Sequence, residues 1–453
     1  MKLFASKIIL VLATVPFLLT SCEDLLDTEP YQQLPDNAAI VDATSANAAL
    51  LGAYSTVQRN YSLNYPTLGF LPADNVRFNG TLNQYLQTDQ NSLTPDNVLI
   101  TDTWTILYQA INSANAIIDA VPTLTDPVLT EADKNRITGE AYFIRAFSFF
   151  DLGRGWGGVP LILKPTRTVN DTRGIRRSTL EQTYDQVLAD LVKAEELLPE
   201  AATRNRAVKK SAQALRARLH LYRQQWADAE AYASLVIASP SYSLIAPYKS
   251  FSTAPFLTPE SVFELTYSNA DPNTLWNNWF PSSLGGQYNF QPTENFITTL
   301  NGSGGNRTSL LASVVIGANT FTYGALYSRA GLRDDPAYVL RLAELYLIRA
   351  EARARQDKLD DTNGAAADLN AVRTRAGLGA TPASTRDALL LAIEEERRLE
   401  FAFEAHRWFD LVRTERADDV LGITDSRKWL FPIPLVDIGA DIDLADDQNP
   451  GYK

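Results

Sequence analysis

The chain has 453 residues, a net charge of −12 and 21% charged residues. This length allows a large hydrophobic core and two or three domains, and the acidity excludes nucleic acid as an expected partner, because negative charge repels the phosphate backbone. The single cysteine, Cys22, rules out an intrachain disulfide and any site built from several thiolates. The two histidines, His220 and His406, lie far apart in the sequence, so we expect neither a metal site nor a cofactor.

The first 21 residues have the pattern of an export signal. Lys2 and Lys7 supply positive charge, and the apolar run 8–19 follows. A helix needs about 20 apolar residues to cross a bilayer, so this run predicts a signal peptide and not a membrane span. The run ends in LTSC, which resembles a lipobox, and Cys22 is therefore predicted to carry lipid and to begin the mature chain. The alternative is an ordinary signal peptide beside an unrelated cysteine.

Helical periodicity marks three parts of the chain, about 45–60, 103–240 and 337–413. Beyond 45–60, the individual helices predicted are 104–120, 131–152, 179–198, 208–225, 227–238, 337–356, 365–376 and 387–413. Their order predicts about four helix pairs of the roughly 34-residue, tetratricopeptide-like kind. An irregular helical domain is the alternative.

Residues 393–413, IEEERRLEFAFEAHRWFDLVR, are predicted to form one continuous helix. The segment has no Gly or Pro, and its wide aromatic stripe indicates packing against other helices. The triplet Glu394–Glu396 is predicted to be a solvated or ion-paired face. Neighbouring side chains on a helix point about 100° apart, whereas a glycosidase needs two carboxyl groups that face each other across the sugar.

Two segments, 61–102 and 241–335, are predicted to be rich in loops. The first is rich in Asn, Gln, Thr and Pro, and the second contains six prolines and the run NGSGG, leaving room for short strands at 261–267 and 320–327. The tail 429–453 is predicted to be extended. The predicted fold class is therefore mainly α, a helical-repeat scaffold with a large irregular insertion that contains short strands.

Residues 273–290, NTLWNNWFPSSLGGQYNF, are the strongest candidate for ligand binding. Their mixture of aromatic rings and amides is typical of sugar sites, where rings stack on the C–H face of a pyranose and amides read its hydroxyls. The alternative is that these aromatics are buried and pin the insertion to the scaffold. The predicted ligand contacts here are Trp276, Asn278, Trp279 and Tyr288, and those in a second segment, 71–85, are Asp74, Asn75, Arg77, Phe78 and Tyr85.

No catalytic motif is found in the sequence. GRGWGG at 153–158 matches a dinucleotide-binding pattern, but a helix is predicted before it and a strand-like run after it, so the glycines are predicted to form a turn at a helix end. Neither a G-x-S-x-G elbow nor an H-E-x-x-H motif is present. We therefore expect a binding protein and not an enzyme.

Five stretches, in this order, resemble the motifs of the SusD/RagB family of nutrient-binding surface lipoproteins: SCEDLLD from Ser21, GEAYFIRAFSFFDLGRGWGGVPLIL from Gly139, YVLRLAELYLIRAEA from Tyr338, ERRLEFAFEAHRWFDLVR from Glu396, and WLFPIP from Trp429 with QNPGY near the end. Family members usually have Gly where Ala405 stands. The resemblance covers nearly the whole chain and implies one SusD-like domain over 22–453.

The resemblance implies a lipid-anchored protein on the outer surface of the outer membrane of a Bacteroidetes-type bacterium. Such a protein captures an oligosaccharide and delivers it to a SusC-like TonB-dependent transporter. In the family, loops from the N-terminal region and the middle insertion line the ligand face, which favours both candidate segments. Three alternatives stay open: a RagB-like protein that binds peptide, a surface glycan hydrolase, and a structural repeat protein without a small ligand.

Overall fold

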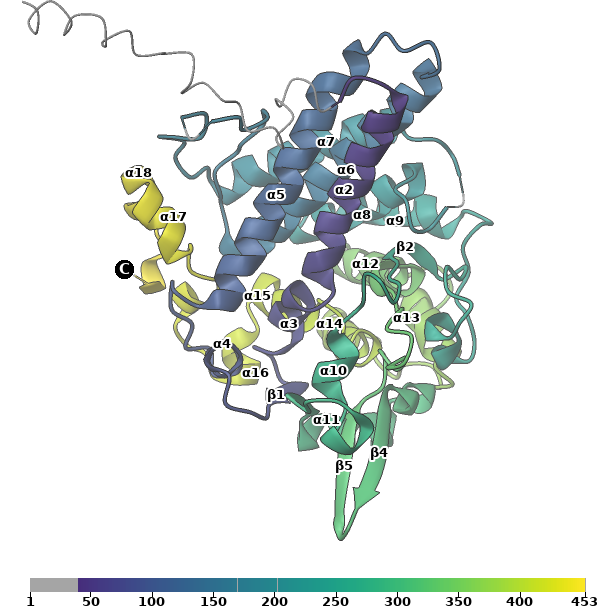
Figure 1. The fold of residues 1–453 in the computed structure, drawn as a ribbon. Coiled ribbons are helices and arrows are strands. Elements are labelled where there is room, and N and C mark those ends of the chain that lie inside the picture. Colours follow the sequence, from purple (N-terminus) through teal and green to yellow (C-terminus); the bar gives the residue numbers. More distant parts are fainter. Residues whose placement is uncertain (1–39, 169, 202, 453) are drawn as a thin grey trace, which may run out of the picture.

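The computed structural model describes residues 40–168, 170–201 and 203–452. Helices dominate this part of the chain, and its strands are few and short (Figure 1). No helix within these ranges has both the length and the apolar character that crossing a membrane requires. The predicted signal segment 1–21 and the predicted lipidation site Cys22 lie outside the described residues.

The long helices form a stack that largely follows the chain. Neighbours in the sequence pack together along this stack, and α9 packs against α12 although the whole insertion separates them. The predicted repeat therefore continues across the insertion, and the predicted helices up to 365–376 are confirmed with shifts of a few residues at their ends. The stack consists of α2 (Ala43–Tyr61), α5 (Val98–Ala120), α6 (Glu131–Trp156), α7 (Leu180–Leu197), α8 (Lys209–Tyr222), α9 (Trp226–Ile237), α12 (Leu342–Arg355), α13 (Ala365–Arg375) and α14 (Arg386–Glu400).

Side-chain caps and glycines fix several helix ends. Thr179 and Gln182 form a capping box at the start of α7, in which each side chain bonds the backbone N–H of the other residue. At the end of α6, Gly157 has φ +82°, a conformation that L-residues with side chains rarely adopt. A Cβ on Gly158 would lie 1.9 Å from the carbonyl oxygen of Ser178. The glycines of GRGWGG thus serve a tight turn at a helix end, as predicted.

The prediction of one continuous helix over 393–413 is wrong. Helix α14 ends at Glu400, and α15 (Arg407–Arg413) begins only after a turn. Phe401 packs into the α12–α14 core cluster, whereas Phe403 lies 4.5 Å from Trp279, ring centre to ring centre, in the main core. A turn after α14 lets these two aromatic side chains reach different cores, which outweighs the local preference for helix.

The insertion folds onto the scaffold through three antiparallel strand pairs. β1 (Val76–Phe78) pairs with β3 (Phe290–Pro292), β2 (Ser261–Leu265) with β6 (Ala337–Arg341), and β4 (Leu311–Ile316) with β5 (Asn319–Gly324). The β4–β5 hairpin projects from the body at the bottom of Figure 1. Short helices in the insertion are α10 (Leu275–Trp279) and α11 (Glu294–Ser303).

Three other boundary predictions are corrected. Residues 337–341, predicted as the start of a helix, form strand β6, because they complete the pair with β2. The loop-rich segment 61–102 also contains α3 (Asn64–Phe70) and α4 (Asn83–Asp89). The tail 429–453 is not extended throughout, because it contains the short helices α17 (Leu435–Ala440) and α18 (Ile442–Ala445). Another short helix, α16 (Ala417–Leu421), precedes the tail.

A cluster of buried ion pairs joins the insertion to the last helices. Arg341 contacts Glu260, Glu400 and Glu404 at 2.6–2.8 Å, and Arg307 contacts Glu400 at 2.7 Å. Burial opposes ionisation of Glu400, but the surrounding arginines outweigh it and lower the pKa of this carboxyl to about 2. Residues 393–413, which we call the signature segment, therefore supply both apolar and ionic contacts to the centre of the molecule.

Candidate functional site

The two segments predicted to bind ligand lie side by side in the structure. Strand β1 pairs with β3 in the register Val76 with Pro292, Arg77 with Gln291 and Phe78 with Phe290. Beyond the strand, the backbone N–H of Asn79 donates to the carbonyl oxygen of Asn289 at 2.7 Å. Residues more than 200 positions apart in the sequence therefore form one continuous surface.

A set of aromatic rings extends this surface onto α10 and β5. Between ring centres, Phe280 lies 6.0 Å from Trp276, which it meets edge-on, and 4.8 Å from Tyr323. Tyr288 lies 5.8 Å from Phe321, also between ring centres. All except Phe280 are partly exposed. We call these five residues the aromatic face.

Amide groups surround the aromatic face. Gln287 is exposed and Asn277 is half-buried, and the backbone N–H of Gln287 donates to the carbonyl oxygen of Asn277 at 2.7 Å. The side-chain N–H₂ of Asn289 donates to the side-chain oxygens of Asn278 and Gln287, each at 2.9 Å. The arrangement offers donors and acceptors next to apolar ring surface, which is the combination that a neutral polyol can use.

Tyr288 is held in one position. Its φ is +55°, and its backbone N–H donates to the carbonyl oxygen of Phe280. Its hydroxyl donates to the carbonyl oxygen of Thr322 at 2.8 Å. Partial burial raises the pKa of the Tyr288 hydroxyl. A strained backbone that several bonds maintain is a feature of functional surfaces, and here it presents the ring beside Phe321.

Trp279 lies in the core. It is 1% exposed and packs against Phe70, Phe290 and Phe403 at 4.5–5.6 Å between ring centres. Gly324 approaches the indole so closely that a Cβ there would lie 2.8 Å from a ring atom. This tryptophan therefore pins the insertion to the scaffold, as the alternative interpretation of these aromatics anticipated.

Asp74, Asn75 and Asn278 also use their polar atoms within the fold. The Asp74 carboxylate contacts Arg407 at 2.7 Å and Arg398 at 3.0 Å, and Asn75 is fully buried. Burial opposes ionisation of Asp74, but Arg407 and Arg398 outweigh it and lower the pKa of the carboxyl. Asn278 is buried and joined to Asn289. These side chains support the surface from behind.

The remaining predicted contacts lie at the edge of the surface. Arg77 is exposed and donates to the side-chain oxygen of Gln291 at 2.8 Å, and Phe78 is half-buried. Tyr85, on α4, is 7% exposed and lies 5.6 Å from Phe78 and 5.3 Å from Phe290 between ring centres. Of the predicted set, Trp276, Tyr288, Arg77 and Phe78 are thus the side chains with accessible surface at this site.

Phe321 and Tyr323 are missing from the sequence-based prediction. Alternation in TFTYG indicates a strand, and Gly317-Ala318 between two strands is a signal for a two-residue hairpin loop. This signal could have identified β4 and β5 as a hairpin. The sequence contains no signal that this hairpin packs beside Tyr288 and Phe280.

Comparison with known proteins agrees with this architecture. A family model described as "Starch-binding associating with outer membrane" (SusD-like) matches residues 24–221, and the SusD family model matches residues 317–425. The chain belongs to the SusD/RagB family. It is 27% identical to SusD-like protein P38 of Formosa agariphila, over 89% of this chain and 90% of that protein. It is 26% identical to a SusD-like protein of Bacteroides ovatus, over 91% and 83% of the two chains.

Solved structures of SusD proteins have the same fold. A SusD superfamily protein from Bacteroides vulgatus aligns with a TM-score of 0.79 at 20% identity, over 90% of this chain and 99% of that one. A structure described as a laminarin-binding SusD-like protein aligns with a TM-score of 0.79 at 24% identity, over 91% and 100%. These matches confirm the mainly helical, tetratricopeptide-like scaffold.

Proposed function

We propose that this protein captures a glycan at the cell surface and that the aromatic face is where the glycan binds. The observation that carries the proposal is the group of partly exposed rings, Trp276, Tyr288, Phe321 and Tyr323, next to amide side chains. Such rings stack on the C–H faces of pyranose units, and each contact is modest and reversible. Capture followed by release needs contacts of this kind.

The carboxylates of the signature segment argue for binding without bond cleavage. Glu394 contacts Arg407 and Arg416, Glu395 contacts Arg398, and Glu396 contacts Arg307 and Arg373. A glycosidase needs one carboxyl that can donate a proton and a second across the sugar. Carboxylates engaged by arginine are poorly suited to either role, so we favour a binding protein over the surface hydrolase.

Family membership supports the rest of the proposal. We infer that Cys22 carries lipid, that the mature chain forms one domain over 22–453 on the outer membrane, and that a SusC-like TonB-dependent transporter receives the ligand. The rigid helical stack would provide the surface for contact with the transporter. A RagB-like peptide ligand is the main rival, since a peptide would rely more on backbone hydrogen bonds than on ring stacking.

The decisive experiment uses protein that starts at residue 23. Calorimetry and affinity electrophoresis would measure binding to laminarin, other neutral and acidic polysaccharides, and a peptide mixture, and a reducing-sugar assay would detect cleavage. We expect binding to one class of glycan without new reducing ends, and loss of that binding in Trp276→Ala. Trp226→Ala is the matched control, because Trp226 is also half-buried but lies on α9. Peptide binding alone would replace the proposal with the rival, and new reducing ends would replace it with the hydrolase.

A further inference from the structure

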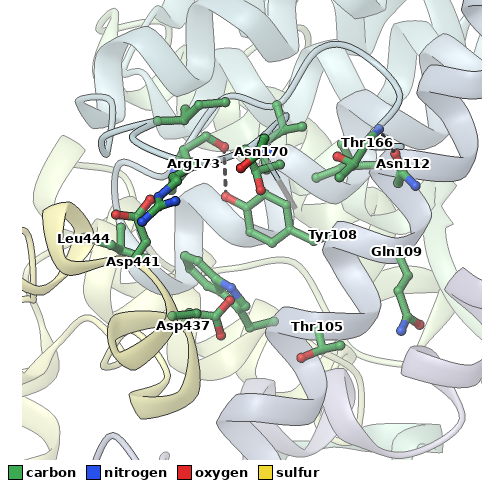
Figure 2. Close-up of a pocket in the computed structure, with 17 residues that line it drawn as sticks. Thr105, Tyr108, Gln109, Asn112, Thr166, Asn170, Arg173, Asp437, Asp441 and Leu444 are labelled. Atoms are coloured by element: carbon green, nitrogen blue, oxygen red, sulfur yellow. Dashed lines mark hydrogen bonds between the residues drawn. The ribbon is translucent and has the colours of Figure 1, made fainter. Parts of the chain in front are cut away.

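A cavity lies apart from the aromatic face. It has a volume of about 650 Å³ and is bounded by α5, the described residues of the segment 160–175 (160–168 and 170–175) and the tail helices α17 and α18 (Figure 2). None of the residues that line it belongs to the aromatic face or to either predicted ligand-binding segment. Its volume is within the range of about 300–1,000 Å³ that is usual for small-molecule sites.

Hydrogen bonds between its walls hold this cavity open. The hydroxyl of Tyr108 donates to the carbonyl oxygen of Pro160 at 2.8 Å, and the backbone N–H of Thr166 donates to the side-chain oxygen of Asn112 at 2.7 Å. On the other side, the backbone N–H of Gly174 donates to the Asp441 carboxylate at 2.9 Å. The segment 160–175 is thus fixed to α5 and to the tail at once, so the cavity is largely formed before any ligand arrives.

The tail is anchored beyond the cavity as well. Arg176 forms an ion pair with Asp447 at 3.0 Å, and Arg177 donates to the carbonyl oxygen of Asp447 at 2.8 Å and to that of Gly158. Asn449 donates to the carbonyl oxygen of Phe431 at 2.7 Å. These bonds hold α17 and α18 in place as one wall.

The lining combines apolar surface with a few polar groups. The apolar part comes from the ring of Tyr108, which lies centrally in Figure 2, and from aliphatic side chains on all three walls. Asp437 lies on the wall formed by α17, and burial raises the pKa of its carboxyl. Arg173, in the segment 160–175, also lines the cavity, and among the described residues its guanidinium forms no ion pair. The aliphatic lining residues are Ile111, Pro160, Ile162, Ile175, Ala440 and Leu444.

This chemistry selects a neutral polyol over a charged ligand. The carboxyl group of Asp437 can accept a hydrogen bond and the guanidinium of Arg173 can donate one, and a sugar hydroxyl takes either role. An anionic ligand would meet the carboxylates of Asp437 and Asp441, and a cationic ligand would meet the guanidinium of Arg173. A purely apolar ligand would leave both groups desolvated without a partner, which is costly. A pyranose ring satisfies both groups and can lay its C–H face on Tyr108.

We propose that this cavity is a second saccharide site, which takes one to three neutral pyranose units independently of the aromatic face. It extends the proposed function, because a protein with two separated sites can hold two parts of one glycan, or one long and one short saccharide. Two linked contacts raise overall affinity through the effective concentration of the second one.

The test measures binding of maltotriose, cellotriose, laminaritriose and mannotriose to protein 23–453 by calorimetry. We expect one of these to bind, and Asp437→Asn to weaken it about tenfold, since hydrogen bonds to charged groups are stronger than those to neutral ones. Ala440→Trp would place an indole in the cavity and abolish the binding. Asp437→Asn replaces one carboxylate oxygen by an amide group of nearly the same size, so the variant preserves the fold.

Two controls separate this proposal from the proposed function. Asp443→Asn changes an exposed carboxyl on the neighbouring helix that does not line the cavity, and we expect no change in affinity. Trp276→Ala should leave trisaccharide binding intact while it removes binding of the long glycan. The inference is overturned if no trisaccharide binds, or if trisaccharide binding is unchanged in both cavity variants. It is also overturned if Trp276→Ala alone abolishes trisaccharide binding, or if only tripeptides compete for the cavity.

Discussion

Asn75 and Arg398 are joined by two buried hydrogen bonds, although 323 positions separate them in the sequence. The side-chain oxygen of Asn75 accepts from Nε of Arg398 at 2.8 Å, and its N–H₂ donates to the carbonyl oxygen of Arg398 at 3.1 Å. Asn75 directly precedes β1, which pairs with β3 at the aromatic face. The signature segment therefore holds the candidate binding surface in place without taking part in it.

Asn75→Ala should destabilise the protein by about 1–3 kcal/mol, because it leaves the carbonyl oxygen and the guanidinium Nε of Arg398 without these partners in a buried site. Urea unfolding followed by circular dichroism would measure the change. Asn79→Ala, which removes one exposed hydrogen bond to the carbonyl oxygen of Tyr288, is the control and should change stability by less than about 1 kcal/mol. Equal effects for the two variants would contradict the supporting role of Asn75.

Trp276 and Trp279 should respond to substitution in opposite ways. Trp279→Ala removes a fully buried ring and should cost about 3–5 kcal/mol of stability. Trp276→Ala removes a half-exposed ring, so stability should change much less, whereas glycan affinity should fall. Thermal unfolding and calorimetry on the same preparations would test both. A stable Trp279→Ala variant that no longer binds glycan would show that the core tryptophan is the ligand contact.

The sequence was sufficient to predict most of the scaffold. Helices such as α5 and α7 show an apolar period of 3.6 residues, and α7 also carries its capping box in the sequence, so local pattern and tertiary structure agree. The turn after Glu400 was not predictable, because nothing in LEFAFEAH breaks a helix. It depends on the separate cores that receive Phe401 and Phe403.

The candidate site was only partly predictable for the same reason. Composition identified the segment around Trp276, but it could not distinguish a half-exposed tryptophan from the buried one three residues later. Phe321 and Tyr323 join the surface through the packing of a hairpin, and Asp437 and Arg173 both line the further cavity although they lie far apart in the sequence. Such contacts between distant segments leave no local periodicity in a single sequence.

Arg375 should be a sensitive position in the buried charge cluster. Its guanidinium contacts both carboxylate oxygens of Glu260 at 2.7 Å and also binds Glu400. Arg375→Met should destabilise the fold by about 3–5 kcal/mol, because it removes one of the buried cations that compensate Glu260 and Glu400 and leaves Arg341 as the remaining ion-pair partner of Glu260. Arg386→Met, which breaks the exposed pair with Asp357, is the control and should cost about 0–1 kcal/mol. Denaturant titration of the two variants would compare them, and a difference below 1 kcal/mol would count against the importance of the cluster.

Gly69 should not tolerate a side chain. A Cβ at this position would lie 2.4 Å from the Cα of Ala405, so backbone would have to move. This contact also explains how Ala405 is accommodated where family members usually have Gly, because the facing residue has no side chain. Gly69→Ala should therefore strongly reduce the melting temperature. Gly52→Ala, where a Cβ meets no atom within 4 Å, should leave it unchanged or raise it, since Ala favours helix by about 1 kcal/mol. Similar melting temperatures for both variants would refute the close contact.

Asp335 should make the protein less stable as the pH rises. Burial raises the pKa of this carboxyl from 3.8 to about 6, Asp334 adds to the effect, and Arg329 and Lys249 oppose it. One carboxylate oxygen accepts from the backbone N–H of Arg329 at 2.7 Å, whereas Oδ1 has no hydrogen-bond partner within the described ranges. Removing the titrating carboxyl should therefore change how stability depends on pH.

The sign follows from proton binding. Between pH 3.8 and about 6 the folded protein holds a proton that the unfolded chain has lost, so this group favours folding less as the pH rises through that window. Its full effect corresponds to about 3 kcal/mol, at about 1.4 kcal/mol per pH unit. The stability of Asp335→Asn relative to the native protein should therefore increase by up to about 3 kcal/mol from pH 4 to pH 7. Urea unfolding of both proteins across this range would measure it, with Asp361→Asn at an exposed carboxyl as the control. A stability difference that does not vary with pH would show that Asp335 ionises normally in the folded protein.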